Sequence, residues 1–276
     1  MLVQPDYESF ASAYDAGQAQ IISTRLVADL ETPVSAMLKL ARSARYSFLL
    51  ESVEGGAVRG RYSIIGMNPD VIWKVENNQA SINRKALHQP DGPFAPTGAE
   101  PLTSLRALLA ESRIALPEGS PPMAAGVFGY LGYDLVRLMV ELPAPKNQGL
   151  GLPDGMMIRP TVMAIFDSVR DEVTVTSPIY PEPGTSARAA YARATERISD
   201  VVDALDRPID MALRQVDAPP MAASQSNTTP DQYKAMVLKA KEHIAAGDIF
   251  QVVLSQRFES EFTLPPLSIL AFQPER

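Results

Sequence analysis

The stretch VIWKVENNQASINR, residues 71–84, decides the fold of the first part of the chain. Residues 71–76 are rich in β-branched and aromatic side chains, and residues 79–84 alternate polar and apolar side chains, as strands do. Between them stand Asn77 and Asn78, which both tolerate the positive φ of a tight hairpin turn. The stretch therefore predicts two antiparallel strands joined by a two-residue turn.

Further hairpins and several helices surround this one. Strands are predicted over residues 19–27, 46–53 and 62–65, and a second hairpin over 160–166 and 172–176. Apolar residues at spacings of three and four predict helices over residues 5–15, 33–43, 102–112 and 185–205. Hairpins mixed with scattered helices, rather than alternating βαβ units, predict an α+β fold: an antiparallel sheet, arranged as a meander, with flanking helices.

The last part of the chain has a different organisation. Residues 206–227 contain several prolines and little periodicity, so we interpret them as a linker. Thr229 and Gln232 form a capping box at the start of a helix over 230–246. A strand is predicted directly after it, over 249–259.

Composition excludes several classes of function. The 276 residues include 25 basic and 32 acidic side chains, a net charge of −7, which is unsuited to sequence-independent binding of nucleic acid. Cysteine is absent, so the chain itself has no disulfide and no Cys-dependent catalysis. The first residues lack the regions of a signal peptide, and no stretch reaches the ~20 apolar residues of a membrane span. We expect a cytoplasmic protein that binds neither nucleic acid nor membranes.

Two features that often carry chemistry are weak here. His88 and His243 lie far apart in the sequence, and neither has a second histidine at ligand spacing. Gly126, Gly129 and Gly132 give G-x-x-G-x-x-G, which differs from the dinucleotide-binding fingerprint. We therefore predict neither a metal site nor a phosphate-binding loop from these residues.

The predicted strand 46–53 carries a carboxylate in an unusual setting. Alternation places Leu50 and Ser52 on one face and Glu51 on the other, which is otherwise mainly apolar. An ionised carboxylate needs a partner there. Either Glu51 is solvated at a sheet edge or pairs with Arg61, or it binds the ammonium group of a zwitterion that has an apolar side chain.

Alternation also divides the predicted strand 249–259. Gln251, Ser255 and Arg257 share one face, and most of the apolar side chains share the other. A row of neutral and cationic donors suits an anionic substrate. The alternative is an ordinary half-buried strand with one wet face.

Four stretches together resemble one enzyme family, anthranilate synthase component I. They are YSFLLES (46–52), RYSIIG (61–66), GVFGYLGYD (126–134) and GDIFQVVLSQRF (247–258). Their order and spacing are similar to the family over nearly the whole chain. The resemblance implies conversion of chorismate and ammonia to anthranilate and pyruvate in tryptophan biosynthesis. It further implies Mg²⁺ as cofactor and a glutamine amidotransferase subunit, component II, as the partner that supplies ammonia.

The resemblance also assigns an effector site. In this family the Leu-Glu-Ser motif belongs to the site for tryptophan, the feedback inhibitor. The resemblance therefore implies that Leu50, Glu51 and Ser52 bind tryptophan, with Ser63 of the Arg-Tyr-Ser motif as a neighbour.

In this resemblance, the residue at position 251 distinguishes the relatives that use water from those that use ammonia. The water-using relatives, isochorismate and salicylate synthases, resemble one another in carrying a lysine base there. A glutamine orients a ligand through hydrogen bonds but cannot abstract a proton from water, which suits an enzyme that uses ammonia. Gln251, Ser255 and Arg257 are thus expected to line the substrate site.

Members of this family are considerably longer than this chain, and most of their catalytic residues lie beyond its last residue. The resemblance implies a regulatory domain over 1–205, a linker over 206–227, and over 228–276 the first helix and strand of a truncated α+β chorismate-binding domain. The Mg²⁺ ligands are expected outside this chain, which should be inactive alone. Two alternatives stay open: component I of para-aminobenzoate (aminodeoxychorismate) synthase, and a non-catalytic amino-acid-binding module.

Overall fold

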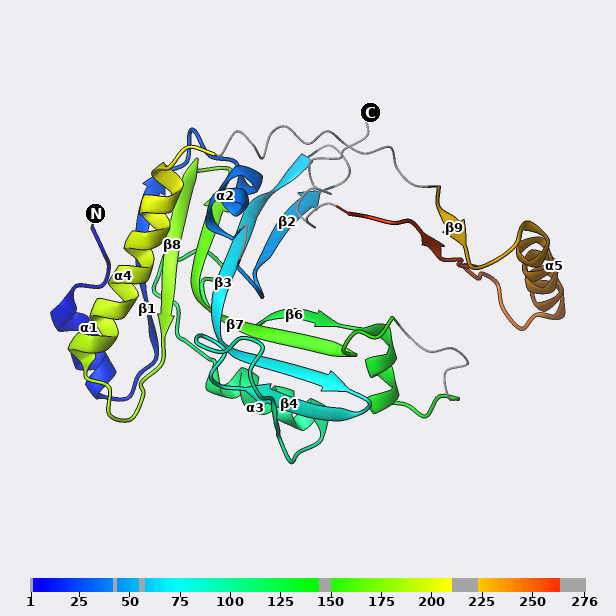
Figure 1. Cartoon of the computed structure of the whole chain (residues 1–276), viewed down its shortest axis with the longest axis horizontal. Coiled ribbons are helices and arrows are strands. Elements are labelled where there is room, and N and C mark those ends of the chain that lie inside the picture. Colours follow the sequence, from blue (N-terminus) through cyan, green and yellow to red (C-terminus); the bar gives the residue numbers. More distant parts are fainter. Residues whose placement is uncertain (1, 42–43, 55–57, 144–149, 210–222, 264–276) are drawn as a thin grey trace. The chain divides into compact units, whose positions relative to one another are not determined.

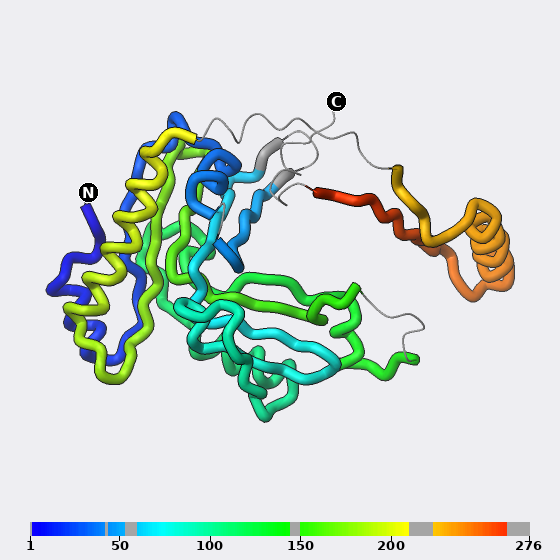
Figure 2. Tube along the Cα trace, in the orientation of Figure 1, coloured from blue at the N-terminus to red at the C-terminus, as the bar shows by residue number. Residues whose placement is uncertain are grey.

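The computed structural model describes residues 2–41, 44–54, 58–143, 150–209 and 223–263. Contacts within the chain divide it into two compact units, Met1–Ile209 and Asp210–Arg276. Figures 1 and 2 show that helices line the sheet of the first unit. The described residues of the second unit form one helix and a short pair of strands.

The first unit is built on an antiparallel sheet of eight strands. The strands are β1 (Gln20–Val27), β2 (Phe48–Glu54), β3 (Val58–Glu76), β4 (Gln79–Asn83), β5 (Ala95–Pro96), β6 (Phe128–Leu131), β7 (Gly155–Asp167) and β8 (Glu172–Ile179). The helices are α1 (Tyr7–Asp15), α2 (Pro33–Leu40), α3 (Pro101–Glu111), the 3-10 helix η1 (Tyr133–Leu138) and α4 (Ala187–Asp206). Among the described helices, none has both the length and the hydrophobicity needed to span a lipid bilayer.

The sheet has two halves: the first half-sheet contains β1, β2 and β8, and the second contains β4, β5 and β6. Two long strands, β3 and β7, run through both halves. The strand order is β1-β8-β7-β3-β4-β5, with β2 also beside β3 and β6 also beside β7. The first part of β3 pairs with β2 and its last part with β4, while β7 pairs with β6 near its start and with β8 near its end. The register between β3 and β7 shifts between Pro69 and Val71, and in this region the sheet bends, as Figure 1 shows.

Helices cover one face of the half-sheet that contains β1 and β8. Helix α4 packs on these two strands and contacts α1 and α2 (Figure 1). Its spacing of three and four residues buries Ala190, Ala194, Ile198, Val201 and Leu205. The fully buried Phe10 of α1 packs against Tyr191 of α4, with their ring centres 5.2 Å apart. This face therefore forms a helix-on-sheet core.

Further core clusters fill the rest of the first unit, and one of them joins Ile72, Ala86 and Ile158. On the opposite face of the same half-sheet, Ile21, Ile64, Phe128, Met163 and Ile165 pack together. The other half-sheet packs against α3 and η1 through Val71, Trp73, Val75, Leu105, Leu108 and Leu135. Both faces of the sheet are therefore partly covered.

The second unit contains α5 (Pro230–Ala246) and a two-stranded pair, β9 (Gln225–Ser226) with β10 (Phe258–Glu259). Thr229 and Gln232 form the predicted capping box, and Gly247 ends the helix at φ 82°, in the left-handed region that glycine favours. None of the residues of α5 is buried.

The antiparallel sheet with flanking helices confirms the predicted α+β fold. The predicted turn is the β3–β4 hairpin, in which Asn77 and Asn78 have φ values of 49° and 62°. The strands predicted over 62–65 and 71–76 are, however, one continuous strand. The irregularity at Pro69 is absorbed as a bulge because β7 pairs with β3 on both sides of it.

The strand predicted over 249–259 is wrong for most of its length. Only Phe258–Glu259 forms a strand, because the only strand that pairs with it in the described residues is the two-residue β9. An alternating sequence needs a neighbouring strand of similar length to become a ladder. Much of the predicted linker, residues 210–222, lies outside the described residues.

Candidate functional site

Strand β2 carries three of the four residues predicted to bind tryptophan. Leu50 pairs with Ile64, and Glu51 pairs with Ser63 on the neighbouring strand β3. Directly paired residues point to the same face of a sheet, and successive residues to opposite faces. The structure therefore brings Glu51 and Ser63 together and places Leu50 on the other face.

Ser52 lies where the ladder becomes irregular. The register between β2 and β3 shifts between Glu51 and Val53. The Ser52 side chain packs so closely over Gly60 that a Cβ atom at residue 60 would overlap it. Glycine thus permits the close approach of the two strands beside Ser52.

This part of β2 is open to solvent. In the described part of the chain β3 is the only strand beside β2, so β2 is an edge strand. Leu50 is 46% exposed, Glu51 and Ser52 are also exposed, and Ser63 is half-buried. A carboxylate, two hydroxyl groups and an apolar side chain are therefore available to a ligand along this edge.

Arg61 does not pair with Glu51, as one interpretation of the sequence had it, but with Asp167 at the end of β7. Its Nε and Nη2 atoms donate to Oδ1 and Oδ2 at 2.9 and 2.8 Å. The backbone N–H groups of Val169 and Arg170 also donate to Asp167 Oδ1. The hydrogen bonds from Arg61, more than these amides, hold the pKa of Asp167 below its ordinary value and raise the pKa of Arg61. The pair ties the start of β3 to the β7–β8 turn.

The acid sensitivity of the fold should report this pair. Because the pKa of Asp167 is lowered in the folded protein, its ionised carboxylate stabilises the fold at pH values above the ordinary pKa of 3.8. This contribution is lost as the pH falls through the lowered pKa. Asp167→Asn removes the contribution. Urea midpoints of the wild type and the variant should therefore differ at neutral pH and converge as the pH falls below 3.8 and through the lowered pKa of Asp167. A difference that stays constant in acid would contradict this assignment.

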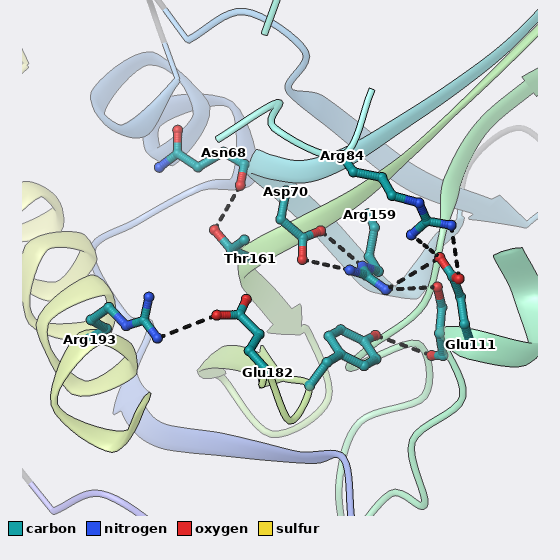
Figure 3. A network of polar contacts seen from close by, with 10 residues as sticks. Asn68, Asp70, Arg84, Glu111, Arg159, Thr161, Glu182 and Arg193 are labelled. Atoms are coloured by element: carbon teal, nitrogen blue, oxygen red, sulfur yellow. Dashed lines mark hydrogen bonds and ion pairs between the residues drawn. The ribbon is translucent and has the colours of Figure 1, made fainter. Parts of the chain in front are cut away.

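A second ion-pair network lies at the bend of the sheet (Figure 3). Arg159 on β7 donates from Nε and Nη2 to the Oδ1 and Oδ2 atoms of Asp70 at 2.9 and 2.8 Å. Glu111 at the end of α3 accepts two hydrogen bonds from Arg84 and lies 4.0 Å from Arg159. Burial opposes the charge on Arg159, but the hydrogen bonds and charge of Asp70 outweigh it and raise the pKa of Arg159.

Tyr180 completes this network. The Arg159 guanidinium lies 4.1 Å from the centre of the Tyr180 ring, and the Tyr180 hydroxyl donates to the Ser112 carbonyl at 3.1 Å. Burial raises the pKa of Tyr180 to about 12, against the opposing charge of Arg159. Sequence reasoning missed this network, because its members are far apart along the chain and share no local pattern.

The residues predicted to line a substrate strand are placed differently from the prediction. Gln251, Ser255 and Arg257 are exposed and lie outside the strands of the second unit. Arg257 Nε is 2.7 Å from Glu259 Oε1, and the Arg257 amide donates to Asn227 Oδ1 at 2.9 Å. The structure therefore does not place the three side chains on one strand face.

The described residues do not form a metal centre. Among them no group of three or more His, Asp or Glu side chains could hold a metal ion. His88 is exposed, and His243 Nδ1 lies 2.8 Å from Asp248 Oδ2 at the end of α5. These residues do not fit a Mg²⁺ site.

Comparisons with known proteins give the family. The model of the chorismate binding enzyme family matches residues 38–272. Anthranilate synthase component 1 of Cereibacter sphaeroides is 50% identical over 263 residues, which cover 95% of this chain and 52% of that protein. The protein of the same name from Thermus thermophilus is 36% identical over 247 residues, covering 88% of this chain and 48% of that protein.

A solved structure supports the fold. The crystal structure of anthranilate synthase component I from Streptococcus pneumoniae superposes with a TM-score of 0.58 at 23% identity, covering 88% of this chain and 50% of that one. The chain thus spans about half the length of the curated relatives it matches. The family predicted from the four sequence stretches is confirmed. The chain belongs to the chorismate-binding enzyme family and is similar to the N-terminal half of anthranilate synthase component 1.

Proposed function

We propose that this chain is the N-terminal part of an anthranilate synthase component 1, which converts chorismate and ammonia to anthranilate and pyruvate. The observation that carries the proposal is the 50% identity to the Cereibacter sphaeroides protein over 95% of this chain. All four stretches that carry the resemblance fall within the family match at residues 38–272. The whole enzyme is expected to work in tryptophan biosynthesis in the cytoplasm.

We propose that three successive segments of the chain have different roles. Residues 1–205 form the regulatory domain, 206–227 the linker, and 228–276 the start of the catalytic domain. The compact unit that ends at Ile209 supports a boundary in this region.

Gln251, Ser255 and Arg257 are proposed to approach the substrate. Their amide, hydroxyl and guanidinium groups are donors suited to an anion such as chorismate. An amide at Gln251 orients a ligand without taking a proton from water, so ammonia is the nucleophile that this position favours.

The cofactor and the partner belong to the same proposal. When bound, Mg²⁺ would supply positive charge to the carboxylates of the substrate, and its ligands would lie in the half of the longer relatives that this chain does not span. Release of ammonia from glutamine in such enzymes needs a cysteine nucleophile, which this chain lacks. The similarity to anthranilate synthase component 1, rather than the missing cysteine, supports a component II subunit as the source of ammonia.

Tryptophan is the proposed effector, bound by Leu50, Glu51, Ser52 and Ser63. The Glu51 carboxylate accepts hydrogen bonds from the ammonium group, and Ser63 lies on the same face. Because Leu50 points to the other face, a ligand that contacts both Glu51 and Leu50 must straddle the exposed edge of β2.

Substitutions in this edge should release the enzyme from inhibition. In the full-length enzyme Glu51→Ala and Ser52→Phe are each expected to weaken inhibition by tryptophan about ten- to a hundredfold, through loss of a charge-assisted hydrogen bond or through steric exclusion. Turnover should stay near normal. Glu118→Ala, which removes another exposed carboxylate of the first unit, is the matched control. Unchanged inhibition in both variants would remove these residues from the site.

Product identity tests the proposed activity. The chain is joined to the C-terminal half of the Cereibacter sphaeroides protein, with the intact Cereibacter protein as control. With chorismate, Mg²⁺ and an ammonium salt, the joined enzyme should release anthranilate, identified by its fluorescence and by chromatography. Release of para-aminobenzoate instead would overturn the assignment.

A further inference from the structure

A small, strongly charged pocket lies at one end of the sheet of the first unit, apart from the residues proposed to bind tryptophan. Its volume is about 190 Å³. Its charged lining residues are Arg25, Arg61, Asp167, Arg170 and Glu172. Thr174, only 6% exposed, adds a polar side chain, and residues 119–121 form another wall.

The pocket lies on the opposite face of the sheet from the Glu51–Ser63 pair. Tyr62 is paired with Asp167, which is paired in turn with Glu172, so these three side chains share a face. Ser63 follows Tyr62 and points to the other face, where it meets Glu51. The pocket is therefore distinct from that pair.

The charges in the pocket are only partly satisfied. Arg61 and Asp167 bind each other through two hydrogen bonds. Arg25 donates from Nη2 to the Gly119 carbonyl at 2.9 Å, and within the described residues its other side-chain N–H groups have no acceptor. The side chains of Arg170 and Glu172 make no hydrogen bond or ion pair with any residue in the described part of the chain. Apart from the Arg61–Asp167 pair, the pocket therefore holds two cations, Arg25 and Arg170, and one carboxylate, Glu172.

We propose that this pocket binds a small oxyanion, a carboxylate or a phosphate, through the guanidinium groups of Arg25 and Arg170. A guanidinium presents paired donors that match the oxygens of both groups, and its charge is permanent. The volume admits an anion of a few heavy atoms. Glu172 repels a bound anion and so limits its affinity. Because the two guanidinium groups and this carboxylate leave one net positive charge, an anion with a single negative charge neutralises the site.

The proposed site also has a structural consequence. Arg25 belongs to β1 and Arg170 to the β7–β8 turn, so a bound oxyanion links two separate segments of the same half-sheet. Binding to the folded state alone raises the stability of the protein as the concentration of ligand rises.

Binding is measured on the 276-residue chain with two probes, sodium phosphate and sodium acetate, at an ionic strength held constant with sodium chloride. The thermal midpoint of the wild type should rise and saturate with at least one probe. Arg170→Gln should weaken the apparent affinity about tenfold. Glu172→Gln should strengthen it. Arg106→Gln, an exposed arginine outside the pocket, should bind as the wild type does.

Equilibrium dialysis with radiolabelled phosphate and acetate gives the same comparison without heating. Saturation with phosphate alone identifies a phosphate site, and saturation with acetate alone a carboxylate site. The proposal is overturned if neither probe saturates, or if Arg170→Gln binds as tightly as the wild type. It is also overturned if Arg106→Gln loses as much affinity as Arg170→Gln, because the effect would then be one of net charge.

Discussion

Replacing Asp70 with alanine is expected to lower the free energy of unfolding by about 3 kcal/mol. Arg159 is only 11% exposed and would keep its charge after losing the carboxylate that accepts two of its hydrogen bonds. Glu111 compensates only weakly for that carboxylate, because it lies 4.0 Å from Arg159 Nη1 and already accepts two hydrogen bonds from Arg84. Urea denaturation followed by circular dichroism measures the loss.

Two controls separate the buried pair from an ordinary surface effect. Arg84→Gln breaks a more exposed pair with Glu111 and should cost less than about 1 kcal/mol. The double variant Asp70→Leu with Arg159→Met leaves no unpaired charge and should recover most of the loss. If Asp70→Ala lost no more free energy of unfolding than Arg84→Gln, the buried Arg159–Asp70 pair would not be a main source of stability at the bend of the sheet.

Trp73→Ala is expected to lower the free energy of unfolding by about 4 kcal/mol. Trp73 is 1% exposed and packs with Leu105 and Leu108 of α3, and its indole N–H donates to the hydroxyl of Ser104. The substitution leaves a large cavity and an unpaired buried hydroxyl. Circular dichroism must be the probe, because Trp73 is the only tryptophan of the chain.

The control for Trp73 is a surface truncation of the same sheet. Val169→Ala in the β7–β8 turn, where the side chain is 70% exposed, should change the free energy of unfolding by less than about 0.5 kcal/mol. If Trp73→Ala cost no more than Val169→Ala, the second half-sheet would not depend on packing against α3.

Elements whose signal is complete within a few residues were predictable. The Asn77–Asn78 turn and the Thr229 capping box have the predicted geometry, because each depends only on close neighbours in the sequence. The unbroken β3 was not predictable, since pairing with β7 carries it across the irregularity at Pro69. The segment 249–259 shows the converse, because alternation without a neighbouring strand gave no ladder there.

The candidate site divides in the same way. Alternation correctly separated Leu50 from Glu51, because that depends on strand geometry alone. The partner of Arg61 was not predictable, since Asp167 is 106 positions away. The pairing of Arg159 with Asp70 spans 89 positions for the same reason. Such pairs follow from sheet register, which a single sequence does not specify.

Turnover of chorismate to anthranilate by the 276-residue chain alone, compared with the enzyme joined to the Cereibacter C-terminal half, measures whether the catalytic residues lie outside this chain. We expect no anthranilate from the chain alone and anthranilate from the joined enzyme, with inhibition by tryptophan that depends on Glu51. Anthranilate from the chain alone would contradict the placement of the catalytic residues. A joined enzyme that folds but forms no anthranilate, while the intact Cereibacter protein does, would contradict the proposed activity.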